Sequence, residues 1–256
     1  MSLNWLTEAK DIAAVRQVLA ATPEAVAERK KTNVTGPSPG FSPEEFWHAM
    51  MGCLLSTQQR WDVVSGFLER KPFPLALGKC DEKTVESLVR HELESHRGIR
   101  FAPTIASEAA QNLAWLNGGG WGEVQSHFHA LLAQRSRLPQ WADIDLERQA
   151  AHFVDKKLKG FGPKQSRHLW LWLGLARYEM LLDSRMTKWL HEKGIIPFKV
   201  PSQALADSEF YEFILDKVQT LCRAADDVLP CLLDAAVFSI MNQTGLKTVQ
   251  PESLPH

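Results

Sequence analysis

The chain has 256 residues, of which 45% are hydrophobic and 23% are charged, and this balance is typical of a folded globular protein rather than a disordered or fibrous one. A net charge of −1 gives no sign of a nucleic-acid partner, and no apolar run reaches the roughly 20 residues that span a bilayer. Because the first residues lack the basic region that begins a signal peptide, we expect a cytoplasmic protein that is neither secreted nor embedded in a membrane.

Helical periodicity, with apolar residues three or four positions apart, extends over nearly the whole sequence. We predict helices, in chain order, over residues 6–19, 24–31, 42–55, 62–68, 82–93, 103–116, 121–134, 146–157, 163–173, 184–192, 207–225 and 229–242. The segment 35–40 is typical of a linker, 117–120 of a flexible connection, and 195–200 of a short extended piece. No alternating pattern of useful length indicates a sheet, so the predicted fold class is all-α.

The four cysteines, Cys53, Cys80, Cys222 and Cys231, are far apart in the sequence and form no CxxC pair. This spacing does not support a zinc site, a redox motif or a disulfide framework. We therefore expect free thiols, most of them buried, and a protein without a metal or another cofactor.

The charges are unevenly distributed along the chain. Residues 156–199 contain ten Lys and Arg against three acids, a local net charge of +7, whereas the residues from 200 onward carry −5. A charge run of this kind often forms only a solvated face. The motif near the start of this run, at residues 158–168, favours another interpretation, which is a surface that binds nucleic acid.

Residues 158–168, Leu-Lys-Gly-Phe-Gly-Pro-Lys-Gln-Ser-Arg-His, lie between two predicted helices. Gly160 and Gly162 allow positive φ angles and a close approach of the backbone, and the amides that enter the second helix can bind a phosphodiester. A plain helix-connecting turn explains such a Gly-x-Gly equally well. Two further residues favour the functional interpretation: Lys164 on the first turn of the second helix, and Asp183 nineteen residues later.

This combination resembles the helix-hairpin-helix DNA glycosylases, the superfamily that contains endonuclease III and the 8-oxoguanine glycosylases. The segment 158–164 resembles the hairpin with its catalytic lysine, Asp183 falls where the family keeps its catalytic aspartate, and Leu-Leu-Ser-Thr-Gln-Gln at 54–59 is similar to the segment whose glutamine enters the duplex. The resemblance covers residues 41–190. It implies two helical subdomains with a cleft between them, 41–175 as a central bundle that ends in the hairpin, and 1–40 with 176–256 as the second.

The resemblance also implies a branch of the superfamily. Members with a lysine at the position of Lys164 typically cut the glycosidic bond and then the strand, which implies a bifunctional glycosylase and AP lyase. The four-cysteine iron–sulfur cluster of endonuclease III has no counterpart, since only Cys222 and Cys231 follow Asp183. The sequence after Lys164 is similar to the smaller prokaryotic 8-oxoguanine glycosylases, which implies that 8-oxoguanine is the base removed. It also implies a monomer that is associated with the nucleoid and binds damaged double-stranded DNA. A structural cation on the hairpin carbonyls, as in the family, stays open.

The residue types agree with this chemistry. A lysine amine must be neutral to attack a sugar carbon, and burial, a helix amino terminus and nearby cations would each lower the pKa of Lys164. Its alternative role is that of a solvated or phosphate-binding lysine. Asp183 precedes a predicted helix, where it would act as an N-cap, and a capped carboxylate can also stabilise positive charge on the sugar.

Other candidates surround this pair. His168 lies one turn after Lys164 and would contact the extruded base, unless it is an ordinary core or groove histidine. Gln58 and Gln59 would fill the space that the base leaves, with surface glutamine as the alternative. We expect Lys159 and Arg60 to contact DNA.

Two alternatives to 8-oxoguanine excision remain open. The first is a glycosylase of the same fold that acts on an oxidised pyrimidine or an alkylated base. The second is a helix-hairpin-helix DNA-binding protein without catalysis.

Overall fold

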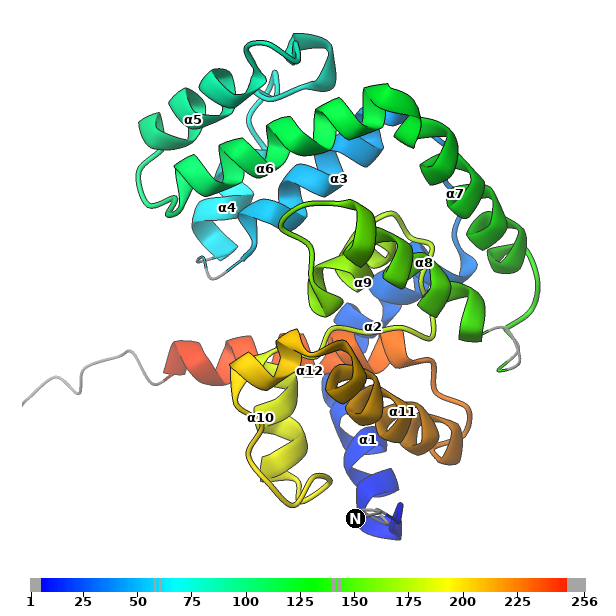
Figure 1. Cartoon of the computed structure of the whole chain (residues 1–256). Coiled ribbons are helices and arrows are strands. Elements are labelled where there is room, and N and C mark those ends of the chain that lie inside the picture. Colours follow the sequence, from blue (N-terminus) through cyan, green and yellow to red (C-terminus); the bar gives the residue numbers. More distant parts are fainter. Residues whose placement is uncertain (1–5, 58, 60, 140, 142–143, 248–256) are drawn as a thin grey trace, which may run out of the picture. The chain divides into compact units, whose positions relative to one another are not determined.

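The computed structural model describes residues 6–57, 59, 61–139, 141 and 144–247. Helices and short helical turns are the regular elements in these ranges, which contain no β-strand, so the predicted all-α fold class is confirmed (Figure 1). None of the described helices is long and apolar enough to cross a membrane. Contacts between Cα atoms divide the chain into two compact units, Met1–Pro37 with Ala176–His256, and Ser38–Leu175.

The unit Ser38–Leu175 contains the motif 158–168. Its helices are α3 (Pro43–Leu55), α4 (Trp61–Leu68), α5 (Val85–Ser95), α6 (Ala102–Trp115), α7 (Trp121–Arg135), α8 (Ile144–Lys157) and α9 (Pro163–Trp172). Helix α3 begins where the sequence predicts, because the Ser42 hydroxyl accepts the Glu45 amide and Pro43 occupies the first turn. It is buried along most of its length and contacts α4, α6 and α9, so it forms the centre of this unit.

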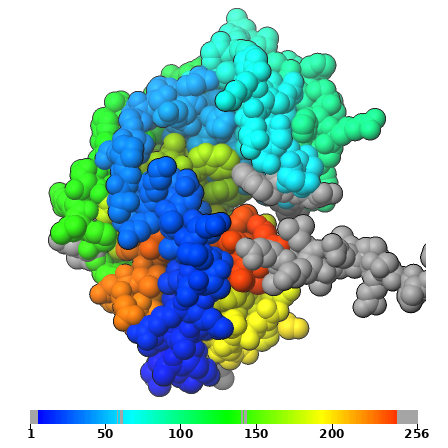
Figure 2. Space-filling model, turned by 180° about the vertical axis from the view of Figure 1, so that it is seen from behind, coloured from blue at the N-terminus to red at the C-terminus, as the bar shows by residue number. Residues whose placement is uncertain are grey.

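The second unit contains α1 (Ala9–Ala21), α2 (Pro23–Lys30), α10 (Ser184–Glu192), α11 (Ser208–Ala224) and α12 (Pro230–Lys247). Helix α12 contacts the other four helices. Figure 2 shows α1 and α2, in blue, lying across α12, in orange and red. The core of this unit therefore forms around α12.

Three connections differ from the predictions. Residues Leu116–Gly120 form a π-helical turn that joins α6 to α7, with Gly119 at a φ of 116°, rather than a flexible tract. The expected linker begins later than predicted, because Lys31–Thr35 also forms a π-helical turn. Residues 195–200 form a bend and irregular chain and contain no strand. In the first two cases the preceding helix continues, since its carbonyls find hydrogen-bond partners by widening the last turn.

Candidate functional site

The hairpin between α8 and α9 requires glycine at one of its two glycine positions. Gly160 has a φ of +80°, and a Cβ there would overlap the Glu108 carboxylate and lie 2.6 Å from the Leu54 side chain. Gly162 has a φ of −116° and no atom within 4 Å of a Cβ, so it does not use the positive φ that glycine allows. Gly162 is instead the extended N-cap of α9.

The side chain of Asn112, in α6, binds the main chain of the hairpin. The Lys159 amide donates to Asn112 Oδ1 at 2.7 Å, and Asn112 Nδ2 donates to the Lys159 carbonyl at 3.0 Å. Asn112 is buried, whereas the Lys159 side chain is exposed. Sequence reasoning missed Asn112, although a polar residue on the apolar face of a predicted helix was a usable signal.

Lys164 lies on the first turn of α9, and its neighbour Gln165 ties this turn to the end of α3. Gln165 Nε2 donates to the Cys53 carbonyl and to the Thr57 hydroxyl, both at 2.6 Å. Burial raises the pKa of the Cys53 thiol, and the charge of Lys164 opposes that rise, so the amine lies within electrostatic reach of the sulfur. Lys164 itself is partly exposed and can be reached from solvent.

Three side chains form a row on one face of α9, because Lys164, His168 and Trp172 are four residues apart. The rings of His168 and Trp172 have centroids 5.4 Å apart, and Ser56 Oγ lies 3.5 Å from His168 Nδ1. A Cβ on Gly52 would come within 2.6 Å of the Trp172 ring, so the absence of a side chain at Gly52 makes room for the indole.

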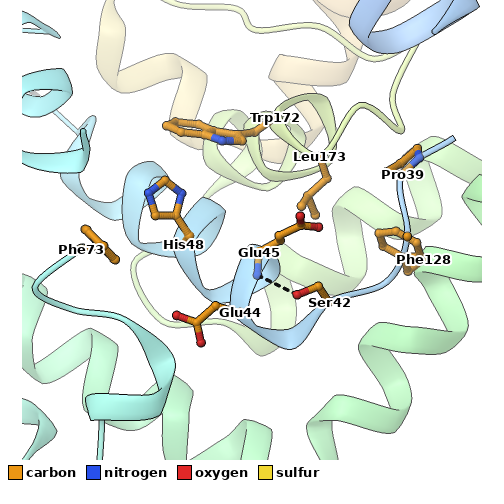
Figure 3. Close-up of a pocket in the computed structure, with 10 residues that line it drawn as sticks. Pro39, Ser42, Glu44, Glu45, His48, Phe73, Phe128, Trp172 and Leu173 are labelled. Atoms are coloured by element: carbon orange, nitrogen blue, oxygen red, sulfur yellow. Dashed lines mark hydrogen bonds between the residues drawn. The ribbon is translucent and has the colours of Figure 1, made fainter. Parts of the chain in front are cut away.

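A pocket of about 430 Å³ opens beside Trp172 (Figure 3). Figure 3 shows Phe73 and Phe128 at opposite sides of the pocket, with Glu45 between them. His48 connects the aromatic groups, because its ring centroid lies 4.7 Å from that of Phe73 and 6.4 Å from that of Trp172. Flat apolar walls with a carboxylate between them suit a planar ligand that carries N–H donors.

The loop after α3 contains three of the predicted DNA contacts. Gln58 and Arg60 lie outside the described residues. The amide of Gln59 forms two hydrogen bonds to the Arg100 main chain, with Nε2 donating at 3.1 Å and Oε1 accepting at 2.8 Å. Gln59 therefore joins this loop to the segment 97–101, and its contact with an orphan base stays a prediction.

Phe101 caps the amino terminus of α6 with unusual backbone geometry. Its φ of 63° is in the left-handed region, which an aromatic residue seldom adopts, and the residue is 49% exposed. Strain and an exposed aromatic side chain at the same position are typical of a functional site.

Asp183 is the N-cap of α10, as the sequence predicts. Its Oδ1 accepts the amides of Arg185 at 2.9 Å and of Met186 at 3.0 Å, and Arg185 Nε lies 3.9 Å from Oδ2. Asp183 and Lys164 belong to different units. The cleft expected between the two units stays a prediction.

Cysteine and acidic side chains are also the residue types that could form a metal site. Among the described residues, no group of three or more His, Cys, Asp or Glu side chains could hold a metal ion. Cys53, Cys222 and Cys231 are buried free thiols, and Cys80 is partly exposed.

Comparison with known proteins identifies the fold. No family model and no curated protein matches the sequence. The 8-oxoguanine DNA glycosylase of Thermotoga maritima matches with a TM-score of 0.60 and 13% identity over 90% of this chain and 94% of that one. The 8-oxoguanine DNA glycosylase of Methanocaldococcus jannaschii matches with a TM-score of 0.62 and 15% identity over 91% of this chain and 94% of that one.

A second structure from Methanocaldococcus jannaschii is the 8-oxoguanine glycosylase/lyase in complex with a 15mer DNA containing 8-oxoguanine. It matches with a TM-score of 0.62 and 15% identity over 91% of this chain and 97% of that one. The chain therefore has the fold of these glycosylases, which confirms the all-helical glycosylase fold that the helix-hairpin-helix resemblance implies.

Proposed function

We propose that this protein is a DNA-repair glycosylase and AP lyase that forms a Schiff base through Lys164. The observation that carries the proposal is the position of Lys164, partly exposed on the first turn of the helix that follows a glycine hairpin. The fold shared with 8-oxoguanine DNA glycosylases supports it. A hairpin that only connected two helices would not need a lysine beside it.

The hairpin would bind the DNA backbone. Its exposed residues Lys159 and Gly160, together with Gly162, bring main-chain amides and one cation to the amino-terminal end of α9, where a phosphate is favoured. Phe101 would enter the duplex beside the site of extrusion, because it is an exposed apolar side chain in a strained turn. Gln59 supports this turn through the Arg100 main chain.

The proposed reaction begins when the neutral Lys164 amine attacks the anomeric carbon of the damaged nucleotide. The C–N bond to the base breaks, and the base leaves with the bonding electrons and accepts a proton. The attached amine then gives up one proton, the bond from the anomeric carbon to the ring oxygen breaks, and the ring oxygen takes up a proton, which leaves an open-chain protonated Schiff base. Loss of a proton from the adjacent carbon then expels the 3′ phosphate with the electrons of its C–O bond. The Asp183 carboxylate would stabilise the cationic sugar and transfer protons, while the α10 amides hold one of its oxygens.

We propose 8-oxoguanine as the base. His168 and Trp172 form a continuous aromatic surface after Lys164, and the pocket beside Trp172 holds the Glu45 carboxylate, which suits the N–H donors of an oxidised purine. An oxidised pyrimidine or an alkylated base would present fewer such donors to the same wall. The activity would need neither an iron–sulfur cluster nor a catalytic metal. Excision in the presence of EDTA tests the need for a free metal ion, and the brown colour and visible absorption of an iron–sulfur cluster, if present, would contradict the absence of the cluster.

Borohydride trapping on duplex DNA that contains 8-oxoguanine tests the proposal. The parent protein should form a covalent complex, and Lys164→Gln should abolish it. Lys159→Gln is the matched control, because it removes a cation five positions away while its backbone stays bonded to Asn112. It should weaken DNA binding, since we propose that Lys159 contacts the phosphate, but it should still form the covalent complex at saturating DNA.

Three outcomes would contradict parts of the proposal. A Lys164→Gln protein that still traps would remove Lys164 from the nucleophile role. A parent that binds DNA but traps no lesion would favour the non-catalytic alternative. Faster excision of an oxidised pyrimidine or an alkylated base than of 8-oxoguanine, in a panel of such lesions, would contradict the proposed substrate.

A further inference from the structure

The segment that leads into Asp183 is buried but has no regular secondary structure. Residues 176–182 contain no helix or strand, and all but Leu181 are buried. Buried main-chain amides and carbonyls need hydrogen-bond partners, and a segment outside helices and sheets must find them elsewhere. The protein supplies these partners mostly from side chains of the surrounding helices.

Two of these partners hold the beginning of the segment. Asn33 Nδ2 donates to the Ala176 carbonyl at 3.0 Å, and Gln219 Nε2 donates to the Tyr178 carbonyl at 2.8 Å. Both amide side chains are buried.

The three residues before Asp183 are held by one hydroxyl and one carboxylate. The hydroxyl of Tyr211, a fully buried residue of α11, accepts the Leu182 amide at 2.8 Å and donates to the Met180 carbonyl at 3.0 Å. Asp234 of α12 accepts the Leu181 amide through Oδ1 at 3.3 Å.

Asp234 is itself fixed and lies close to Asp183. Its Oδ2 pairs with Arg29 Nη1 at 3.1 Å, and its side chain is 8% exposed. Burial raises the pKa of Asp234, Arg29 lowers it, and the charge of Asp183 raises it further, which places the two carboxylates within electrostatic reach of each other. The Leu181 amide also lowers the pKa of Asp234, because it donates a hydrogen bond to the charged carboxylate.

We infer that Tyr211 and Asp234 are positioning residues for Asp183. They fix the main chain on its amino-terminal side, and the Arg185 and Met186 amides fix its carboxylate on the other side. The inference rests on the proposed function, in which the Asp183 carboxylate must face a developing charge on the sugar. A displacement of about 1 Å in such a group costs roughly a hundredfold in rate.

Tyr211→Phe tests this with the loss of one oxygen atom. Single-turnover excision at saturating DNA should slow at least tenfold, whereas the DNA concentration at half saturation should change less than twofold, because the hairpin belongs to the other unit. Asp234→Ala, which removes the oxygen that accepts the Leu181 amide, should give the same pattern.

Thr22→Val is the matched control for the loss of a buried hydroxyl. Thr22 lies in the same unit, is 4% exposed, and donates to the Val18 carbonyl at 2.9 Å. Its removal should lower the thermal stability in the same way as Tyr211→Phe but leave the saturating excision rate within twofold of the parent.

Amide hydrogen exchange measures how firmly the main chain around Asp183 is fixed, and it does not depend on catalysis. Tyr211→Phe should accelerate exchange at Leu182 and at the Asp183-bonded amides of Arg185 and Met186, and Thr22→Val should not. Excision rates equal to those of Thr22→Val, or unchanged exchange at Arg185 and Met186, would overturn the inference. A parent that excises no base would refute the proposed function alone, since the exchange measurement would still decide whether Tyr211 holds Asp183.

Discussion

Gly160→Ala should destabilise the protein strongly although the residue lies in an exposed turn. A non-glycine residue at a φ of +80° costs about 1–2 kcal/mol. The added Cβ would also overlap the Glu108 carboxylate and press on Leu54, and overpacking of this kind costs about 1–3 kcal/mol. The lower entropy of the unfolded alanine chain offsets part of this, about 0.4–1 kcal/mol. We therefore expect the free energy of unfolding to fall by about 2–4 kcal/mol.

Gly162→Ala is the matched control, two residues away in the same turn. Gly162 has an extended backbone, and no atom lies within 4 Å of the position of a Cβ. The weaker helix cap that alanine provides and the lower entropy of the unfolded chain nearly cancel, so the free energy of unfolding should stay within about 1 kcal/mol of the parent.

Urea unfolding followed by circular dichroism gives both free energies, and fluorescence anisotropy with a labelled duplex reports DNA binding. Gly160→Ala should also weaken DNA binding at least tenfold, because the displaced turn carries the proposed phosphate contacts. Glu108→Ala in the Gly160→Ala background should restore part of the stability, since it removes one of the two side chains that the Cβ meets.

Equal losses of stability for the two glycine variants would refute this reasoning. They would mean that the turn needs glycine for a general reason, such as the entropy of the chain, rather than for the φ angle and crowding at Gly160. A Gly160→Ala protein as stable as the parent would show that the turn can shift past Glu108 at little cost.

Three further predictions concern single side chains. For Asp183→Asn, the free energy of unfolding should stay within about 1 kcal/mol of that of the parent, since asparagine caps helices well. The single-turnover excision rate should nevertheless fall at least roughly a hundredfold, and a parent-like rate would leave Asp183 with a capping role alone. Burial raises the pKa of Cys80 to about 11, so roughly 0.1% of this thiol is thiolate at pH 8. Its alkylation by iodoacetamide, followed by mass spectrometry, should therefore be slow, and labelling as fast as that of a small thiol would contradict this. Burial lowers the pKa of His127, which stacks on Phe153 at 4.2 Å, while Glu123 raises it. The folded state therefore binds this proton less tightly than the unfolded state, and stability should fall as the pH drops below 6.5; an equal fall in His127→Phe would argue against it.

The helices could be predicted because their signals are local. Helix α10 spans Ser184–Glu192 as predicted, since Asp183 caps it and apolar residues recur at helical spacing. Trp170 and Trp172 differ in exposure for an equally local reason, because residues two apart cannot share a helix face. The structure buries Trp170 and leaves Trp172 partly exposed at the pocket.

The supports of the site could not be predicted in the same way. Asn112 meets Lys159 across 47 residues, and Tyr211 meets Leu182 across 29, so both contacts depend on how helices pack. An aspartate between apolar neighbours, as at Asp234, indicates a buried partner but does not identify Arg29. Gly160 differs from Gly162 because Glu108 and Leu54 approach it from other helices, which no local pattern records.

Helix α6 connects two regions that we propose touch DNA. Phe101 caps its beginning, and Asn112 near its end holds the hairpin. Eleven residues of helix measure ~16 Å, which is close to five nucleotide steps along one DNA strand at ~3.4 Å each. The length of α6 would then set the number of nucleotides between the point where the duplex is opened and the point where its backbone is gripped. One residue inserted into α6 would add ~1.5 Å and turn Phe101 by ~100°, so the footprint on DNA and the choice of nucleotide to be extruded should change together.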